Sequence, residues 1–400
     1  MNKIPTKKSG FNPNWQIKTL GDIFLIERGS SPRPIKSFLT NDNNGINWIK
    51  IGDAKNNSKY IYQSAEKIRP EGKKYSRFVE IGDLILSNSM SFGRPYIMKT
   101  IGCIHDGWVV LRKILKNIIY EEYAYYILSS NQVHSEFSKL AAGSVVKNLS
   151  IDRIKQVYIP IPPLDEQKRI ASALSKIDEY LENTIKLIEE KERFKRGIAK
   201  KLLTCKEGEN IPEARFKGFE GEWETKALNS ISNIKKGEQK NKLDLIADGK
   251  YPVLNGGMNF SGYCNSYNRE ANTITISEGG NAGYVNFIKE KFWSSGHCYT
   301  LHDLKIDKYF LYQCLKNSEK RLMKLQLGTA LKNIRQSEIV EFELNIPKSI
   351  KEQEKIGGYL SLLDAEIDNL KKQKELIKEM KRGAMQKLLS GEVRLVDNYD

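Results

Sequence analysis

Two stretches of the sequence, PPLDEQKRIASAL at residues 162–174 and PKSIKEQEKIGGYL at residues 347–360, are imperfect copies of one pattern. The first contains Asp165, Glu166 and Lys168. A metal-dependent nuclease could use such a carboxylate–lysine grouping to bind its ion and to position water. The second copy decides whether this interpretation fits the sequence.

The second copy keeps the features of a helix start and loses the lysine. Glu354 stands where the first copy has Lys168. Ser349 and Glu352 have the spacing of a capping box, and Pro163 can open the first turn of a helix. Acidic residues near a helix start also favour its positive end. Each stretch is therefore interpreted as the beginning of a long helix.

The similarity extends along the whole chain. Residue 166 lines up with residue 352, and the match continues at the same offset to the end of each predicted helix. Other segments match in the same order: FNPNWQIKTL (11–20) with FEGEWETKAL (219–228), LILSNSMSFGR (84–94) with ITISEGGNAGY (274–284), and GSVVKNL (143–149) with GTALKNI (328–334). The chain is therefore a tandem pair of diverged units.

Each unit has an irregular front part and a helical back part. The front parts contain short β-branched or alternating runs broken by Gly, Asn and Ser, which is typical of strands and turns. The back parts place apolar residues at alternating steps of four and three, the a/d spacing of a coiled coil. The expected fold class is α+β, with two tandem globular domains that are each followed by a long α-helix. The predicted seam residues are Ile170, Leu174, Ile177, Leu181, Ile188, Ile198 and Leu202 in the first helix, and Ile356, Leu360, Leu363, Ile367, Leu370, Ile377 and Leu388 in the second.

A helix of about 40 residues spans about 60 Å and is not stable as a lone rod with one apolar stripe. The repeat supplies a partner for each stripe. We expect the two helices to pack as an antiparallel coiled-coil spacer with pseudo-twofold symmetry. The alternative, core helices of one large domain, fits the narrow seam less well.

The composition limits the class of protein. The 400 residues carry a formal net charge of +16, which favours polyanionic partners, although a lysine-rich protein without nucleic acid remains the alternative. No apolar run is long enough to span a membrane, and five scattered cysteines are typical of a reducing cytoplasm. Phosphate-loop and dinucleotide motifs are missing, and no His/Cys spacing matches a zinc module. We therefore expect a cytoplasmic binding protein without catalytic residues or a metal site.

Polar loops and basic clusters of the front parts are candidates for nucleic-acid contacts. The glycine-containing turns at 87–94 and 277–283 follow strands and differ in side chains, which suits base edges. The Lys-Asn pairs at 147–148 and 332–333 are identical, which suits phosphates or loop structure. Solvated hairpin tips and ordinary surface lysines are the alternatives. The candidates are Arg33, Lys73, Lys74, Arg77, Ser89, Arg94, Lys147, Asn148, Lys235, Lys236, Asn281, Lys332 and Asn333.

Longer segments of the chain resemble a known family. They are IPIPPLDEQKRIASAL (159–174), KRGIAKKLLT (195–204), ENIPEARFKGFEGEWETKAL (209–228) and KRGAMQKLLSGEVRL (381–395). With the Lys-Asn loops between them, they are similar to the specificity subunit of type I restriction-modification enzymes over essentially the whole chain. The departures are mild: the first front part begins with a looser motif, and the second helix start lacks one proline.

The resemblance implies domains, a function and partners. Residues 1–160 and 206–346 (the latter with a linker) would be target-recognition domains that each read half of a bipartite, asymmetric double-stranded DNA site. Residues 161–205 would be the first spacer helix, of the conserved-region type, and residues 347–400 the second spacer helix and tail. The helices would scaffold two methyltransferase (modification) subunits and the restriction/translocase subunits.

The subunit itself would have no catalytic activity and no cofactor. S-adenosylmethionine, ATP and Mg²⁺ would belong to its partners, and the assembled complex would be an adenine-specific DNA methyltransferase and ATP-dependent endonuclease. Two alternatives from other classes stay open. One is a metal-dependent nuclease that uses Asp165, Glu166 and Lys168, and the other is a coiled-coil adaptor that binds only proteins.

Overall fold

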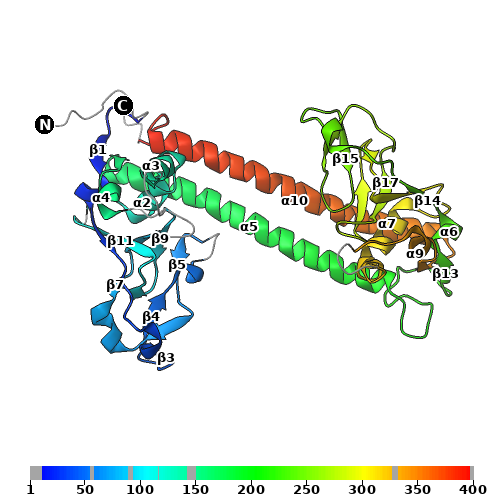
Figure 1. The fold of residues 1–400 in the computed structure, drawn as a ribbon, viewed down its shortest axis with the longest axis horizontal. Helices are drawn as coiled ribbons and strands as arrows, with labels where there is room; N and C mark the ends of the chain where they lie inside the picture. Colours follow the sequence, from blue (N-terminus) through cyan, green and yellow to red (C-terminus); the bar gives the residue numbers. More distant parts are fainter. Residues whose placement is uncertain are drawn as a thin grey trace. The chain divides into compact units, whose positions relative to one another are not determined.

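The computed structural model describes residues 11–54, 58–88, 93–115, 117–141, 150–326 and 332–396. The chain divides into two units, the first made of Met1–Asn183 with Lys374–Asp400 and the second of Thr184–Gln373. Two long helices, α5 (Leu164–Leu203) and α10 (Ile350–Ser390), each contribute to both units (Figure 1). Within the described residues, no helix is long and apolar enough to cross a bilayer.

The globular part of the first unit contains two five-stranded sheets. Buried, largely apolar runs such as LILS form central strands, because their side chains pack on both faces of a covered sheet. One sheet has the order β2 (Phe24–Arg28), β11 (Trp108–Lys113), β8 (Leu84–Ser87), β9 (Pro95–Met98) and β5 (Tyr60–Ile61). The other has the order β3 (Leu39–Thr40), β6 (Glu66–Ile68), β4 (Ile46–Ile49), β10 (Gly102–Ile104) and β7 (Arg77–Val79).

Short elements complete the first unit. Strand β1 (Gln16–Thr19) pairs antiparallel with β12 (Tyr158–Ile161), the strand that leads into α5. A capping box between Thr19 and Asp22 starts the next turn of helix. The helices are α1 (Leu20–Ile23), α2 (Glu121–Leu128), α3 (Asn131–Ala141) and α4 (Ile151–Lys155), with 3-10 turns η1 (Ile35–Ser37), η2 (Ile51–Asp53) and η3 (Pro70–Tyr75).

The second unit repeats this plan with fewer strands. Strand β13 (Glu224–Ala227) pairs antiparallel with β21 (Glu343–Ile346), the strand that precedes α10. One sheet has the order β14 (Asn233–Lys236), β20 (Cys298–His302), β17 (Thr273–Ser277) and β18 (Val285–Ile288), and the other β16 (Gly262–Cys264), β15 (Tyr251–Leu254) and β19 (Trp293–Ser294). The helices are α6 (Leu228–Ile231), α7 (Lys308–Asn317), α8 (Glu319–Met323) and α9 (Gln336–Val340), with η4 at Lys242–Asp244.

The two long helices run antiparallel within each unit. In the second unit Lys191 pairs with Glu366 and Lys195 with Asp364, so the residue number falls along α10 as it rises along α5. In the first unit Asp178 of α5 pairs with Lys381 of α10. Every predicted seam residue is buried or half-buried, as a coiled-coil seam requires. The predicted fold class, two tandem α+β domains with long helices, is confirmed.

The ends of the helices also enter the cores of the globular parts. Leu388 and Leu389 of α10 lie in the first unit's core, together with Ile170 and Leu174 of α5. Leu202 and Leu203 of α5 lie in the second unit's core, together with the beginning of α10. The core of each globular part therefore contains the start of one long helix and the end of the other. This packing fixes the position of the globular part on the two helices.

Candidate nucleic-acid interface

The motif that suggested a nuclease forms a buried ion pair at the start of α5. The Glu166 side chain is 1% exposed, and Arg394 binds it with Nε 2.6 Å from Oε1 and Nη2 2.7 Å from Oε2. Trp15 donates its indole N–H to Oε2 at 3.2 Å. Arg394 follows the end of α10, so this bidentate pair connects the start of α5 to the segment that follows α10.

The second unit repeats this arrangement with different residues. Arg215, in the segment that follows α5, donates through Nε and Nη2 to the two carboxylate oxygens of Glu352, at 2.7 Å each. The Glu352 side chain is 2% exposed. Arg215 also donates to the carbonyl oxygens of Glu220 and Gly221, which orders the segment leading to Trp223. Sequence reasoning missed both pairs; the available signal was an arginine shortly after each long helix.

The glutamine that follows each glutamate connects the helix start to the globular part. Gln167 donates to the carbonyl of Pro162 and accepts from the N–H of Tyr120, which precedes α2. Gln353 likewise donates to the carbonyl of Pro347, and it accepts from the N–H of Asp307, which precedes α7. The Glu-Gln dipeptide is thus a structural joint in both units, and the interpretation as a mere helix opening was incomplete.

The geometry gives no support to the nuclease interpretation. Lys168 pairs with Asp165 at 3.2 Å, and both side chains are more than half exposed, while Glu166 is held by Arg394. Within the part of the chain that the structure describes, no group of three His, Cys, Asp or Glu residues could hold a metal ion. The grouping therefore lacks an available pair of carboxylates for metal catalysis.

A second joint, at an aspartate that follows the buried glutamate in each long helix, is also duplicated. In the first unit Asp178 accepts from the Tyr126 hydroxyl of α2 at 2.7 Å and from Lys381. In the second unit Asp364 accepts from the Gln313 amide of α7 at 2.7 Å and from Lys195 at 2.6 Å. Asp364 lies 186 residues after Asp178, and Lys381 lies 186 residues after Lys195. Each aspartate therefore joins a globular-part helix to both long helices.

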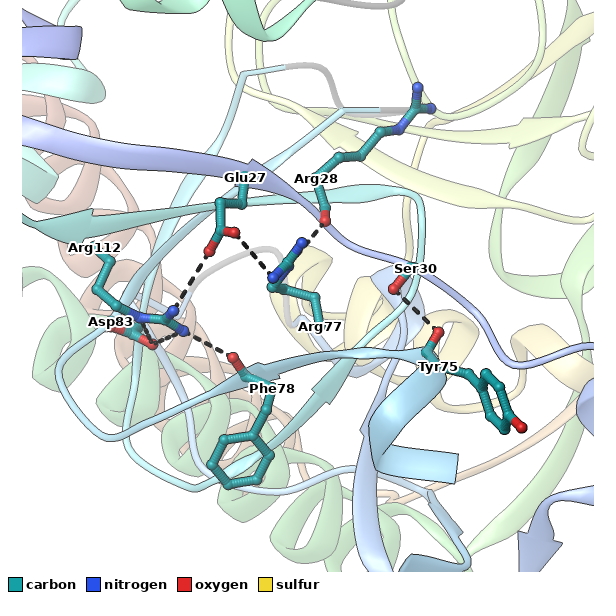
Figure 2. A network of polar contacts seen from close by, with 8 residues as sticks. All are labelled: Glu27, Arg28, Ser30, Tyr75, Arg77, Phe78, Asp83 and Arg112. Atoms are coloured by element: carbon teal, nitrogen blue, oxygen red, sulfur yellow. Dashed lines mark hydrogen bonds and ion pairs between the residues drawn. The ribbon is translucent and has the colours of Figure 1, made fainter. Parts of the chain in front are cut away.

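A basic hollow of about 720 Å³ lies beside β7 in the first unit, with Lys73, Lys74, Arg77 and Arg112 in its lining. Figure 2 shows how its arginines are held: Arg112 lies against Asp83 and Glu27, and Arg77 contacts Glu27 and the carbonyl of Arg28. These acidic partners neutralise the arginines. Lys73 and Lys74 are exposed and lie over the rings of Phe78 and Tyr75, at 3.8 and 4.8 Å from the ring centroids.

The remaining candidates of the first unit are dispersed or undescribed. Arg33 lies in the segment after β2, with its guanidinium 3.6 Å from Asp106. Arg94 has its guanidinium carbon 5.4 Å from the centre of the Tyr96 ring. Ser89, Lys147 and Asn148 lie outside the described residues.

In the second unit, four of the five candidates lie at a strand end or on loops that contact one another. Lys236 ends β14 and pairs with Glu278 at 2.6 Å. Asn281 follows Glu278 on the glycine-containing turn, and Lys332 and Asn333 are exposed beside it. Lys235 is the fifth candidate; it is exposed and precedes Lys236 on the strand, so its side chain points to the other face.

Burial raises the pKa of several thiols and hydroxyls. Burial raises the pKa of the Cys298 thiol to about 11 and that of the Tyr125 hydroxyl to about 12. Burial also raises the pKa of the Cys314 thiol well above its usual range. Such groups stay protonated near neutral pH, so these thiols are inert structural residues rather than nucleophiles.

The two repeated parts of the sequence match the model of a known family. Residues 12–190 and 220–379 fit the model of the type I restriction modification DNA specificity domain. The chain belongs to this family. The matched ranges cover both globular parts and most of both long helices, so the repeat found in the sequence is a repeat of the family's domain.

Relatives of this specificity-domain protein include specificity subunits from bacteria and an archaeon. A putative type I specificity subunit of Mycoplasma pneumoniae is 37% identical over 171 residues, which cover 42% of this chain and 46% of the relative. That match therefore spans less than half of the relative's length. The putative type I restriction enzyme MjaX specificity subunit of Methanocaldococcus jannaschii is 25% identical over 413 residues, covering 96% of this chain and 94% of the relative.

Solved structures agree on the fold. The crystal structure of a type I restriction-modification S subunit from M. genitalium has a TM-score of 0.65 at 20% identity, and covers 96% of this chain and 97% of that chain. A chain from a structural study of complex assembly and conformational transition of the type I restriction-modification system has a TM-score of 0.60 at 14% identity, covering 96% and 99%. At these identities the likeness concerns the fold alone.

Proposed function

We propose that this chain is the DNA-specificity subunit of a type I restriction-modification complex. Its two globular parts read the two halves of a bipartite, asymmetric DNA site. The observation that carries the proposal is the duplication: each unit has the same joints at the two long helices, yet the outer loops of the two units carry different side chains. Two domains with the same architecture but different surface side chains suit a DNA site whose two halves differ in sequence.

The partners follow from the family. Type I specificity subunits would bind two modification subunits and the restriction subunits, and S-adenosylmethionine, ATP and Mg²⁺ would be bound by those partners. Catalysis by this chain itself is not part of the proposal, because Glu166 and Lys168 are each engaged in a structural pair. Such a complex would act in the cytoplasm, where the DNA is.

Mapping methylated adenines tests this function. DNA carrying random sequence is exposed to this chain with its methyltransferase subunit and S-adenosylmethionine, and the methylated positions are sequenced. The expected result is a single two-part motif with an unread gap of fixed length. Methylation without a sequence motif, or a motif unaffected by replacing this chain with another specificity subunit, would contradict the proposal.

The two other function classes give different results in simple assays. A nuclease would cut DNA with Mg²⁺ in the absence of any partner, and the Lys168→Ala variant would lose that cleavage. A protein-only adaptor would show no binding to duplex DNA that weakens with salt, whereas a DNA reader loses affinity steeply as salt rises.

A further inference from the structure

Five loops of the second unit meet at one end of its sheets. They follow β14 (237–241), β15 (255–261) and β17 (278–284), precede β20 (295–297), and lead into α9 (332–335). Hydrogen bonds join them directly: Glu278 N–H donates to the His297 carbonyl at 2.9 Å, Gly257 N–H to the Ser277 hydroxyl at 3.0 Å, and Ile334 N–H to the Glu278 carbonyl at 2.9 Å. We call these five loops the second-unit loop cluster.

Glycines let the loops of the cluster approach one another closely. Gly256 has a φ of +74°, and a Cβ there would lie 2.6 Å from the carbonyl oxygen of Gly279. A Cβ at Gly237 would lie 2.2 Å from the carbonyl oxygen of Ser295. No other residue type could be placed at these positions without moving backbone. The cluster is therefore a packed platform, on which side chains can be held in defined positions.

Glu278 fixes the centre of this platform. One carboxylate oxygen accepts from Lys236 at 2.6 Å and from the Tyr299 hydroxyl at 2.9 Å. Burial, together with the contact to Glu278, raises the pKa of Tyr299, so its hydroxyl remains a donor. The other oxygen faces His297, whose Nδ1 lies 3.5 Å away. Glu278 is thus a positioning residue for a lysine and a histidine at the surface of the cluster.

The outward-facing side chains of the cluster have the chemistry of base recognition. Amides can form paired hydrogen bonds with adenine, and apolar groups can contact the thymine methyl group. The exposed side chains of the cluster include five amides, one imidazole, two large apolar side chains, two cations, one hydroxyl and one carboxylate. They are Gln239, Asn241, Asn259, Asn281, Asn333, His297, Met258, Phe260, Lys332, Arg335, Ser261 and Glu238.

The first unit keeps the backbone of this platform and changes its side chains. Gly29 N–H donates to the Trp108 carbonyl at 2.8 Å, as Gly237 N–H does to the Cys298 carbonyl. Asn88 N–H donates to the Gly107 carbonyl at 2.8 Å, in the place of Glu278 and His297. The residues at or next to these backbone hydrogen bonds differ between the units. Arg28 replaces Lys236, Asn88 replaces Glu278, and Asp106 stands where the second unit has Gly296. A kept platform with exchanged side chains is expected if the platforms select different bases.

We infer that the second-unit loop cluster is the surface that reads the second half-site, with Gln239, Asn281 and His297 contacting base edges and Lys332 a phosphate. The inference rests on the proposed function, and it deepens it by placing base selection on this surface. The ligand is a duplex DNA half-site, because the exposed cations and amides on one platform match phosphates and base edges.

The test uses the full chain assembled with its methyltransferase subunit. Binding and methylation are measured on DNA libraries in which the second half-site is randomised and the first is fixed, and then the reverse. Gln239→Ala and Asn281→Ala should change the preference at one base pair of one half-site by about 5- to 150-fold, the equivalent of one lost paired base contact. The preference at the other half-site should not change.

Two comparisons keep the test sharp. Lys332→Ala should weaken binding about equally for all sequences and lower the salt slope by about one, because a phosphate contact carries no base information. Asn229→Ala is the matched amide control: Asn229 is exposed in α6, at the opposite end of β14 from Lys236, and bonds Glu341. It should change neither half-site.

The outcomes separate the inference from the function beneath it. If wild-type complex shows no sequence motif, the proposed function fails. If the wild type has a two-part motif and neither Gln239→Ala, Asn281→Ala nor His297→Ala changes it, the loop cluster is not the reading surface and the inference is overturned. If these variants lose the methyltransferase subunit on purification while the parent keeps it, the cluster is a subunit interface, which also overturns the inference.

Discussion

Replacing Arg215 with methionine tests the buried joint at the start of α10. The substitution keeps the apolar part of the side chain and removes the guanidinium, so Glu352 would be left charged, unpaired and 2% exposed. Removing one partner of a buried ion pair costs about 3–5 kcal/mol. The freed carbonyls of Glu220 and Gly221 are on exposed residues and can bind water, so they add little.

The assay is thermal unfolding combined with hydrogen exchange at the first turns of α10. With about 2–4 °C per kcal/mol for a unit of this size, the melting temperature of the second unit should fall by about 6–20 °C. Amides near Glu352 should exchange faster in proportion. Lys168→Met is the control, since the Lys168–Asp165 pair is exposed on both sides and worth at most about 1 kcal/mol.

The repeat also predicts which of the two arginine substitutions destabilises its unit more. Arg394→Met disrupts the corresponding pair of the first unit, but Glu166 would keep its hydrogen bond from Trp15. The corresponding indole N–H of Trp223 has no hydrogen-bond partner among the described residues. Arg215→Met should therefore destabilise its unit more than Arg394→Met does. The reasoning is refuted if Arg215→Met behaves like Lys168→Met, or if the order of the two arginines is reversed. The double variant Arg215→Met/Glu352→Gln should recover about 1–3 kcal/mol, because it removes the stranded charge.

Other consequences can be measured on the same protein. Ile367→Asp, which puts a carboxylate into the seam at a position 5% exposed, should cost about 3 kcal/mol or more in urea unfolding, whereas Asp at Leu376, 64% exposed, should cost little. Burial lowers the pKa of His302 from 6.5, so the stabilising contribution of the neutral imidazole is present above that pH and is lost as the pH falls. His302→Gln should therefore reduce the loss of stability between about pH 7.5 and about pH 5.5. An unchanged loss would show that protonation of His302 is not its cause. Among the five thiols, Cys205 should react first with a maleimide in the native state, since the other four are buried; mass spectrometry of the labelled peptide decides this.

The sequence predicted the repeat and the helices well because those features are periodic. A seam with a fixed step must lie on one side of a helix, and two copies of one motif at one offset must begin the same element. The joints were harder to predict. Glu166 and Arg394 are separated by 228 residues, and no local pattern says which arginine reaches a buried glutamate. The side chains of a tertiary ion pair are recognised only once the backbone brings them together.

The loop cluster shows the same division. Lys236, Asn281 and the Lys332-Asn333 pair could be selected because they stand at strand ends or in repeated motifs. Gln239 and His297 carry no such signal, and only the folded backbone places Gln239 near Gly296 and His297 near Gly279 in the cluster. In the first unit the charged cluster at 73–77 was visible in the sequence, but the neutralisation of Arg77 by Glu27 was not, because β2 and β7 are far apart in the chain.

What the two units share and what they do not share follows from the physics of each contact. A buried carboxylate cannot lose its partner without a cost of about 3–5 kcal/mol, so Glu166 and Glu352 both keep an arginine even though the arginines come from unlike segments. Asp178 and Asp364 both keep a lysine, while the third partner changes from tyrosine to glutamine, because either can donate one hydrogen bond. Exposed loop side chains have no such constraint and can change without loss of stability. A duplicated DNA-reading domain can therefore acquire two different specificities while both copies keep the same type of buried ion pair. We expect the residues of the buried pairs to stay constant between the two units and the exposed loop residues to vary.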